Sequence, residues 1–123
     1  TFGKPLAKRQ AIQQTIADMG TQINALRLMI WDCAADYDAG KDIDMKASMC
    51  KLFSIDTVRV VSDAMLEIFG GIGYFEDCEY GPTERLYRDC RAMWLEEGPR
   101  TVQRLTAFRG LDKTGGVIEY AED

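Results

Sequence analysis

Apolar residues recur at helical spacing through most of this chain. Within residues 1–40 they alternate at intervals of four and three, the pattern of helices that pack in bundles. The pattern predicts one long helix with Pro5 in its first turn and Gly40 at its C-terminal cap. Gly20 lies inside this helix, where glycine costs about 1 kcal/mol relative to alanine. The predicted seam consists of Ile12, Ile16, Met19, Ile23, Leu26, Ile30, Cys33 and Tyr37.

A second helix is predicted over residues 44–69, with Asp44 as its N-cap. It ends at "GGIGY", because Gly70, Gly71 and Gly73 do not continue a helix cheaply. Its apolar positions keep a helical period: Met45, Met49, Leu52, Val60, Ala64 and Ile68.

Two further helices are predicted over residues 83–97 and 100–111, separated by Gly98-Pro99. After Gly110 the tail is acidic and contains glycines, and we expect it to be extended or frayed. No segment alternates as a strand does. The sequence therefore predicts an all-α, up-and-down helical bundle with short loops.

Composition narrows the possible functions. Of 123 residues, 46% are hydrophobic and 28% charged, which is typical of a globular protein. Fifteen basic and twenty acidic residues give a net charge of −5, which disfavours nucleic acid and anionic membrane surfaces as partners. No apolar run approaches the ~20 residues of a membrane span, so no stable membrane insertion is expected.

The chain has four cysteines and no histidine. No C-x-x-C pair occurs, so zinc fingers and Ser-His or Cys-His nucleophiles are poorly supported. Cys33 and Cys50 fall on apolar stripes, where a free thiol behaves as a small hydrophobic group. Reduced core thiols in a reducing compartment are favoured, although disulfides stay open.

Two interhelical breaks carry unusual residues. The glycines of "EIFGGIGY" let another molecule approach the backbone, but a glycine C-cap is the favoured interpretation. Glu96 and Glu97 end the predicted helix 83–97, where a carboxylate opposes the macrodipole by a few tenths of a kcal/mol. Either glutamate could be a surface charge or a reactive group, and the surface charge is the favoured interpretation. Since adjacent helical residues point about 100° apart, at most one faces a given site.

The order of four motifs resembles the C-terminal helical domain of the acyl-CoA dehydrogenase family. These motifs are "TFGKPLAKRQAIQ", "ASMCKLFSIDTVRVVSDAMLEIFGGIGY", "ERLYRDCR" and "LEEGPRTVQRL". The resemblance covers about residues 1–111 and leaves 112–123 as a tail.

The resemblance implies an FAD enzyme that oxidises the Cα–Cβ bond of an acyl-CoA to a trans-2-enoyl-CoA. A glutamate removes the α-proton while the β-hydride passes to the flavin, and that glutamate matches Glu97, with Gly98 beside the substrate. The flavin contacts implied are Phe2, Glu67, Gly70, Gly71, Pro99 and Thr101. Implied partners are a homodimer or homotetramer and an electron-transferring flavoprotein, in the cytoplasm or, in a eukaryote, the mitochondrial matrix.

Several positions depart from the family's pattern. Pro99 replaces a flavin-contacting threonine, and Thr101 replaces a glutamine that contacts the adenine half. Glu67 replaces a glutamine that reaches the neighbouring subunit's FAD, and its carboxylate would repel a pyrophosphate. These changes motivate a second hypothesis, an oligomerisation scaffold with a decayed flavin site. An oxidase that passes electrons to oxygen is a third.

The family's N-terminal and middle domains, and the first helix of its C-terminal bundle, match nothing in these residues. We therefore expect this chain to be a fragment that is inactive alone. A bundle lacking one helix exposes an apolar face, which predicts self-association.

Overall fold

The computed structural model of the protein describes residues 3–120, so Phe2 lies outside the described residues. Within this range the regular elements are all helical, as predicted, and no strand occurs. Their order is η1 (Leu6–Lys8), α1 (Gln10–Asp38), α2 (Asp44–Phe69), α3 (Gly71–Tyr74), α4 (Thr83–Cys90), η2 (Ala92–Trp94) and α5 (Arg100–Lys113).

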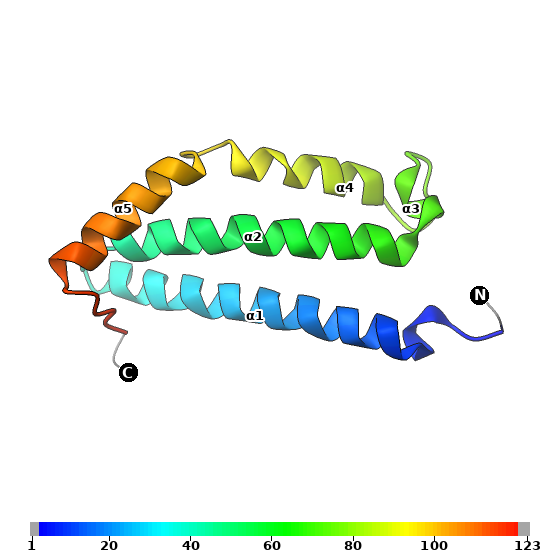
Figure 1. Ribbon diagram of the computed structural model, residues 1–123, viewed down its shortest axis with the longest axis horizontal. Helices are drawn as coiled ribbons and strands as arrows, with labels where there is room; N and C mark the ends of the chain where they lie inside the picture. The colour runs from blue at the N-terminus through cyan, green and yellow to red at the C-terminus, as the bar shows by residue number, and fades with distance from the viewer. Residues whose placement is uncertain (1–2, 121–123) are drawn as a thin grey trace.

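Helix α2 lies at the centre of the fold. It packs against α1 on one side and against α4 and α5 on the other (Figure 1). The chain reverses direction between α1 and α2, and again between α2 and α4, which gives the predicted up-and-down arrangement. The buried apolar residues are Ile55 on α2, Cys33 on α1 and Ala107 on α5, and Ile55 is only 1% exposed. The core is therefore small and centred on one helix.

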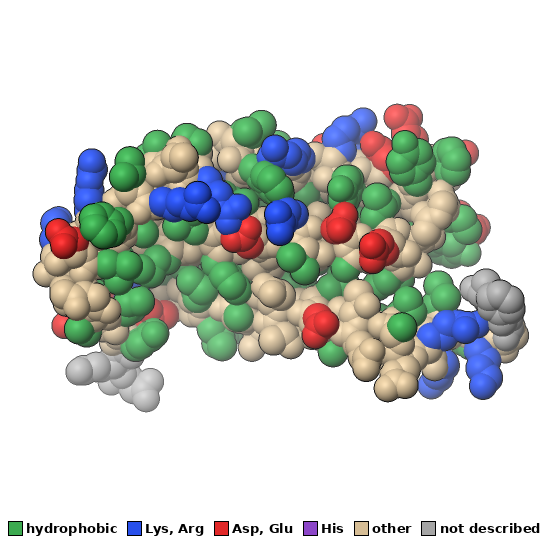
Figure 2. Space-filling model, viewed as in Figure 1, with side chains coloured by type: hydrophobic (Ala, Val, Ile, Leu, Met, Phe, Trp, Pro, Cys, Tyr) green, Lys and Arg blue, Asp and Glu red, His purple; other side chains and the backbone are tan. Residues whose placement is uncertain are grey.

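Only half of the predicted α1 seam is covered. Ile12, Met19, Leu26 and Cys33, which are seven residues apart, are partly or fully buried. The intervening set Ile16, Ile23, Ile30 and Tyr37 is exposed. This division arises because α2 is the helix that packs along α1 and covers one flank of the seam. Apolar side chains are accordingly visible over much of the molecular surface (Figure 2).

The end of α1 is the glycine cap that the sequence predicts. Gly40 has a φ of +72°. Its amide donates to Tyr37 O (2.9 Å), and the Lys41 amide donates to Asp36 O (3.0 Å). This is the Schellman arrangement, which requires a residue that tolerates positive φ. The predicted start is wrong, because Pro5 precedes η1 and α1 begins only at Gln10.

The predicted end of α2 at Phe69 is confirmed, but its predicted N-cap is wrong. Asp44 is the first helical residue, and its amide donates to Asp42 Oδ1 at 3.0 Å. An Asx-type bond from Asp42 thus replaces the expected cap, which follows because an aspartate side chain readily accepts from the amide two residues on. At the other end, Gly70 has a φ of +61°. Residues Gly71–Tyr74 then form the one-turn helix α3.

The predicted helix 83–97 is wrong in its second half. α4 ends at Cys90, and the chain tightens into η2 through i→i−3 bonds such as Leu95 N to Ala92 O (2.9 Å). Pro99 disfavours helical backbone in the residue before it, and Gly98 adopts a φ of +97°. Glu96 and Glu97 therefore follow η2 and do not end a long helix, so the expected opposition to a helix macrodipole does not arise.

The tail departs from the prediction near its start. α5 continues to Lys113, and the chain then reverses at Gly115-Gly116, both with positive φ. The tail returns to α2, where the Tyr120 ring centroid lies 5.7 Å from Lys46 Nζ. The described end of the tail, residues 117–120, thus has no regular secondary structure, in line with the expected extended end, and Tyr120 contacts the start of α2.

A buried charge cluster joins α1 to the beginning of α2. The Lys46 ammonium pairs with Asp36 and, at 2.7 Å, with Asp32, and Lys41 pairs with Asp36 at 3.0 Å. Hydrogen bonds from Lys46 and Lys41 lower the pKa of Asp36. Burial by itself would lower the pKa of Lys46, but the bonds to both aspartates outweigh it and the pKa is raised. Each charged form is therefore stabilised by folding.

These shifts predict the pH dependence of stability. The contribution of Asp36 is present above its ordinary pKa near 4 and is lost as pH falls through the lower folded value. Lys46 contributes below its ordinary pKa of 10.5, and loses that contribution as pH rises through the raised value. We expect Asp36→Asn to lower Tm at pH 7 by roughly 5–10 °C. Thermal melts followed by circular dichroism from pH 2 to 7 give Tm as a function of pH. The Tm values of the wild type and of Asp36→Asn should converge in acid.

Asp18→Asn is the control, because Asp18 is an exposed aspartate of the same helix. Curves for wild type and Asp36→Asn that stay equally far apart at pH 2 and 7 would show that the carboxylate charge does not stabilise the fold.

Alanine substitution at two glycines of the α1 region is expected to change the free energy of unfolding in opposite directions. Gly20 has helical backbone, and an added Cβ would meet no atom within 4 Å, so Gly20→Ala should raise the free energy of unfolding by about 0.5–1 kcal/mol. Gly40 has equal space but positive φ, so Gly40→Ala should lower it by about 1 kcal/mol. Urea titrations measure both values. Stabilisation by Gly40→Ala would contradict the Schellman cap.

Candidate functional site

The Gly70-Gly71 corner presents exposed backbone at one end of α2. Gly70 donates to Leu66 O at 2.8 Å and accepts from Gly73 N at 3.0 Å. A Cβ at either Gly70 or Gly71 would meet nothing within 4 Å. Both glycines are exposed, so another molecule could approach this backbone closely.

Gly73, in contrast, is a packing residue. A Cβ there would lie 2.5 Å from Phe69 Cβ and 3.2 Å from Thr83 Oγ1. The Thr83 hydroxyl, in a residue only 4% exposed, donates to Gly73 O at 2.7 Å. This bond ties the first residue of α4 to α3 and fixes the corner.

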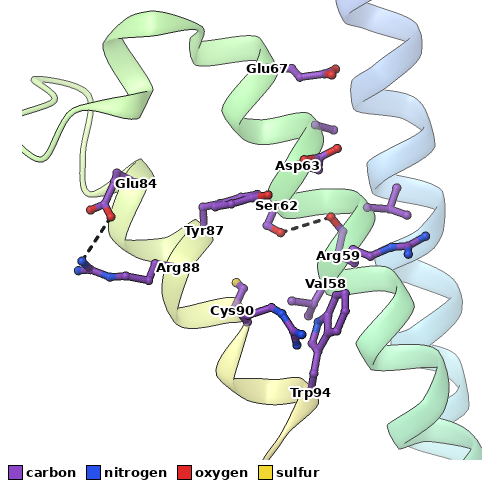
Figure 3. Close-up of a pocket in the computed structure, with 13 residues that line it drawn as sticks. Val58, Arg59, Ser62, Asp63, Glu67, Glu84, Tyr87, Arg88, Cys90 and Trp94 are labelled. Carbon is purple, nitrogen blue, oxygen red and sulfur yellow. Dashed lines mark hydrogen bonds and ion pairs between the residues drawn. The ribbon is translucent and has the colours of Figure 1, made fainter. Parts of the chain in front are cut away.

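A groove of about 920 Å³ runs between α2 and the α4–η2 segment. Arg59, Asp63 and Glu67 line it from successive turns of α2, and in the view of Figure 3 they extend from the flank of α2 that is turned away from α4. Glu84, Tyr87 and Arg88 project from α4, and Glu84 pairs with Arg88 at 3.4 Å. At the η2 end the Arg91 guanidinium lies 3.9 Å from the centroid of the Trp94 ring. Of the predicted site residues that the structure describes, only Glu67 lines this groove.

Glu97 stands in the turn between η2 and α5. Its φ is +55°, and among the described residues no other non-glycine has a positive φ. Left-handed backbone costs a residue with a Cβ about 1 kcal/mol or more. Such conformations persist where surrounding contacts impose them, and they cluster at functional sites. The Glu97 side chain is exposed in this chain.

Pro99 and Thr101 follow at the start of α5. Pro99 is the N-cap residue of α5, and no side chain caps this terminus. Its carbonyl accepts from the amides of Val102 (2.9 Å) and Gln103 (3.2 Å). Thr101 is an exposed residue of the first helical turn. Neither residue contacts the Gly70-Gly71 corner, which lies at the far end of α4 (Figure 1).

Two contacts that sequence reasoning missed hold this turn. Gln103 Nε2 donates to Glu97 O at 3.0 Å, and Arg100 pairs with Asp56 of α2. The Arg100–Asp56 pair joins residues 44 positions apart. No spacing rule predicts the Arg100–Asp56 pair. The Gln103 bond, in contrast, spans only six residues, and both of its residues belong to the motif "LEEGPRTVQRL".

The predicted residues therefore form two groups. Glu67, Gly70 and Gly71 lie at the α2–α3 end, while Glu97, Gly98, Pro99 and Thr101 lie between η2 and α5. The structure does not bring the two groups together within one chain.

The remaining candidate chemistry gives no second site. No cluster of side chains in residues 3–120 has the composition of a metal site. No helix there is long and apolar enough to cross a membrane. Burial raises the pKa of the Cys50 thiol to about 11, and the neighbouring Cys33 adds to the shift. A thiol of this kind is a weak nucleophile at neutral pH.

The comparisons with known proteins give the family. The model of the family described as "Acyl-CoA dehydrogenase, C-terminal domain" matches residues 1–111. The chain belongs to the acyl-CoA dehydrogenase family and corresponds to its C-terminal helical domain.

Named relatives include both dehydrogenases and reductases. The chain is 42% identical over 113 residues to cyclohexane-1-carbonyl-CoA dehydrogenase of Geobacter metallireducens. The aligned residues cover 92% of this chain and 29% of that protein. It is 41% identical to 3-(aryl)acrylate reductase of Clostridium sporogenes, with 91% and 29% covered. The solved structure of butyryl-CoA dehydrogenase from Megasphaera elsdenii superposes with a TM-score of 0.83 at 34% identity, over 90% of this chain and 28% of that one. The chain thus spans less than a third of the length of these relatives.

The different surroundings of Gly71 and Gly73 predict different effects of alanine substitution on stability. Gly73→Ala should lower the free energy of unfolding by about 1–3 kcal/mol, because the new Cβ overlaps Phe69. Gly71→Ala should change it by less than about 0.5 kcal/mol, since its position is open and its φ is ordinary. Urea unfolding measures both. Equal losses would contradict the division into a packed and an open glycine.

Proposed function

We propose that this chain is the C-terminal domain of a longer FAD-dependent acyl-CoA dehydrogenase, with Glu97 as the base that removes the α-proton. The observation that carries the proposal is the Glu97-Gly98 turn, in which one carboxylate stands on imposed left-handed backbone immediately before α5. The family match over residues 1–111 includes this turn and supports the proposal.

The described residues fit a flavin in part. Gly70 and Gly71 offer open backbone, Thr101 offers an exposed hydroxyl, and the first turn of α5 contains no acidic residue. Pro99 has no N–H to donate, and Glu67 presents an exposed carboxylate to the groove. Because the two groups lie apart, we propose that each contributes to a different flavin site, as in an oligomer where one subunit reaches its neighbour's cofactor.

In this proposal the chain supplies positioning and proton transfer. A base must lie within hydrogen-bond reach of the proton it removes, and the fixed turn holds the Glu97 carboxylate outside the helical surface. Gly98, with a φ of +97°, keeps the chain beside that carboxylate free of a side chain. FAD, when bound, supplies the acceptor for the β-hydride. Acyl-CoA is the substrate, and an electron-transferring flavoprotein is the proposed electron partner.

The exposed half of the α1 seam supports a homodimer or homotetramer. Ile16, Ile23 and Ile30 form an apolar row on α1 that α2 leaves uncovered. Burying such a row contributes roughly 25 cal/mol per Å² of apolar surface. We propose that other helices of the complete protein or a second subunit cover it, and that the 123 residues alone have no dehydrogenase activity.

A non-catalytic scaffold with a decayed flavin site is the second candidate. Glu67 and Pro99 favour it, because one adds a negative charge and the other removes a donor at positions proposed to face the cofactor. The flavin content of the complete protein separates the two candidates.

The proposal predicts the outcome of an anaerobic titration of the complete protein with acyl-CoA thioesters. Oxidised-flavin absorbance near 450 nm, about where free flavins absorb, should be bleached by one class of thioester. Glu97→Gln should reduce the bleaching rate by at least about 10³-fold, because the amide cannot accept the proton. Since some relatives are named reductases, reoxidation by the matching enoyl-CoA should be followed as well.

Glu96→Gln is the matched control, because it removes the same charge one residue away and should leave bleaching unchanged. Full bleaching in Glu97→Gln would move the base elsewhere. A purified protein without flavin would favour the scaffold.

A further inference from the structure

We infer that Gln103 is a positioning residue for Glu97: its side-chain amide holds the left-handed turn that presents the carboxylate. The inference rests on the proposed function for its catalytic consequence, but its structural part stands on the geometry of this chain. Gln103 was not among the residues that the sequence assigned to the site.

The first observation is the hydrogen bond. Gln103 Nε2 donates to Glu97 O at 3.0 Å, from the first turn of α5 back across the turn. The acceptor is the carbonyl of the one described non-glycine residue with positive φ. Holding this carbonyl restricts the peptide plane after Glu97, and therefore limits rotation of the strained residue.

The second observation is steric. A Cβ on Gly98 would lie 2.7 Å from Gln103 Nε2 and 3.7 Å from its Cδ. The amide is thus folded directly against the turn, in space that only a glycine at position 98 leaves open. Gly98 and Gln103 are complementary parts of one small arrangement.

The third observation concerns the helical turn from which the Gln103 side chain projects. Gln103 lies three residues after Arg100, which pairs with Asp56 on α2. The backbone amide of Gln103 also donates to Pro99 O at 3.2 Å. The side chain that holds Glu97 therefore projects from a helical turn that is anchored to the central helix. The position of Glu97 relative to α2 is fixed through this turn.

The test compares Gln103→Met with Gln13→Met in the complete enzyme. Methionine keeps the length of the side chain and removes its donor. Gln13 is a matched control, because its Nε2 donates to the Ala7 carbonyl at 2.9 Å, also six residues earlier, at the start of α1. We expect Gln103→Met to lower kcat roughly 10–100-fold with KM and flavin content little changed, since a misplaced base affects the chemical step. Gln13→Met should leave kcat unchanged.

An isotope effect separates positioning from a general structural role. With an α-deuterated acyl-CoA, the kinetic isotope effect on flavin reduction should rise in Gln103→Met, because proton removal limits the rate more strongly. Wild-type kcat and isotope effect in this variant would overturn the inference, as would an equal kcat loss in Gln13→Met.

A double-mutant cycle tests the turn without any activity. In a Glu97→Gly background, glycine adopts positive φ unaided, so Gln103→Met should lower Tm less than it does in the wild-type background. Equal Tm losses in both backgrounds would overturn the structural part. If Glu97→Gln is fully active, the proposed base is wrong and the catalytic part of the inference falls with it, while the cycle still decides whether Gln103 holds the turn.

Discussion

The packing of α2 against α1, α4 and α5 is the contact on which the whole chain depends. Helices α1, α4 and α5 each pack mainly against α2, whose Ile55 is the most deeply buried apolar residue of the described chain. Charged contacts then fix the registers: Lys46 joins the start of α2 to α1, and Asp56 joins its middle to α5. Isolated surface ion pairs contribute little, but the Lys46 cluster is largely removed from solvent, where loss of one partner leaves a buried charge.

The same architecture positions the candidate site residues. The groove along α2 and α4 is lined by both signs of charge, and much of that charge is already engaged in contacts such as Glu84–Arg88. The Glu97 turn, by contrast, lies where the chain passes from η2 to α5 and cannot be helical. A strained residue at such a junction stabilises nothing by itself, and its positive φ is the observation on which the proposed role of Glu97 rests. The apolar row of Ile16, Ile23 and Ile30 on α1 stays exposed in this chain.

Much of the fold followed from local rules. The 3–4 spacing in α1, the glycine cap at Gly40 and the glycine stop after Phe69 each depend on residues close together in the chain, and all three are present. The predictions that were wrong lie at helix ends. Asp42, not Asp44, accepts the amide at the start of α2, and the helix predicted to Glu97 ends at Cys90. At such ends several weak local preferences compete, and contacts such as Arg91 with Trp94 accompany the change.

The sequence by itself determined that the chain is helical, that α2 ends at Gly70-Gly71, and that a Glu-Gly motif and Pro99 precede the last helix. These properties follow from periodicity and from backbone preferences, which act over a few residues. Only the tertiary structure decided which half of the α1 seam is buried, that Gly73 is packed while Gly71 is open, and that Arg100 is anchored to Asp56. Those outcomes depend on which surfaces meet across the bundle, and contact between residues distant in sequence is not encoded in local spacing.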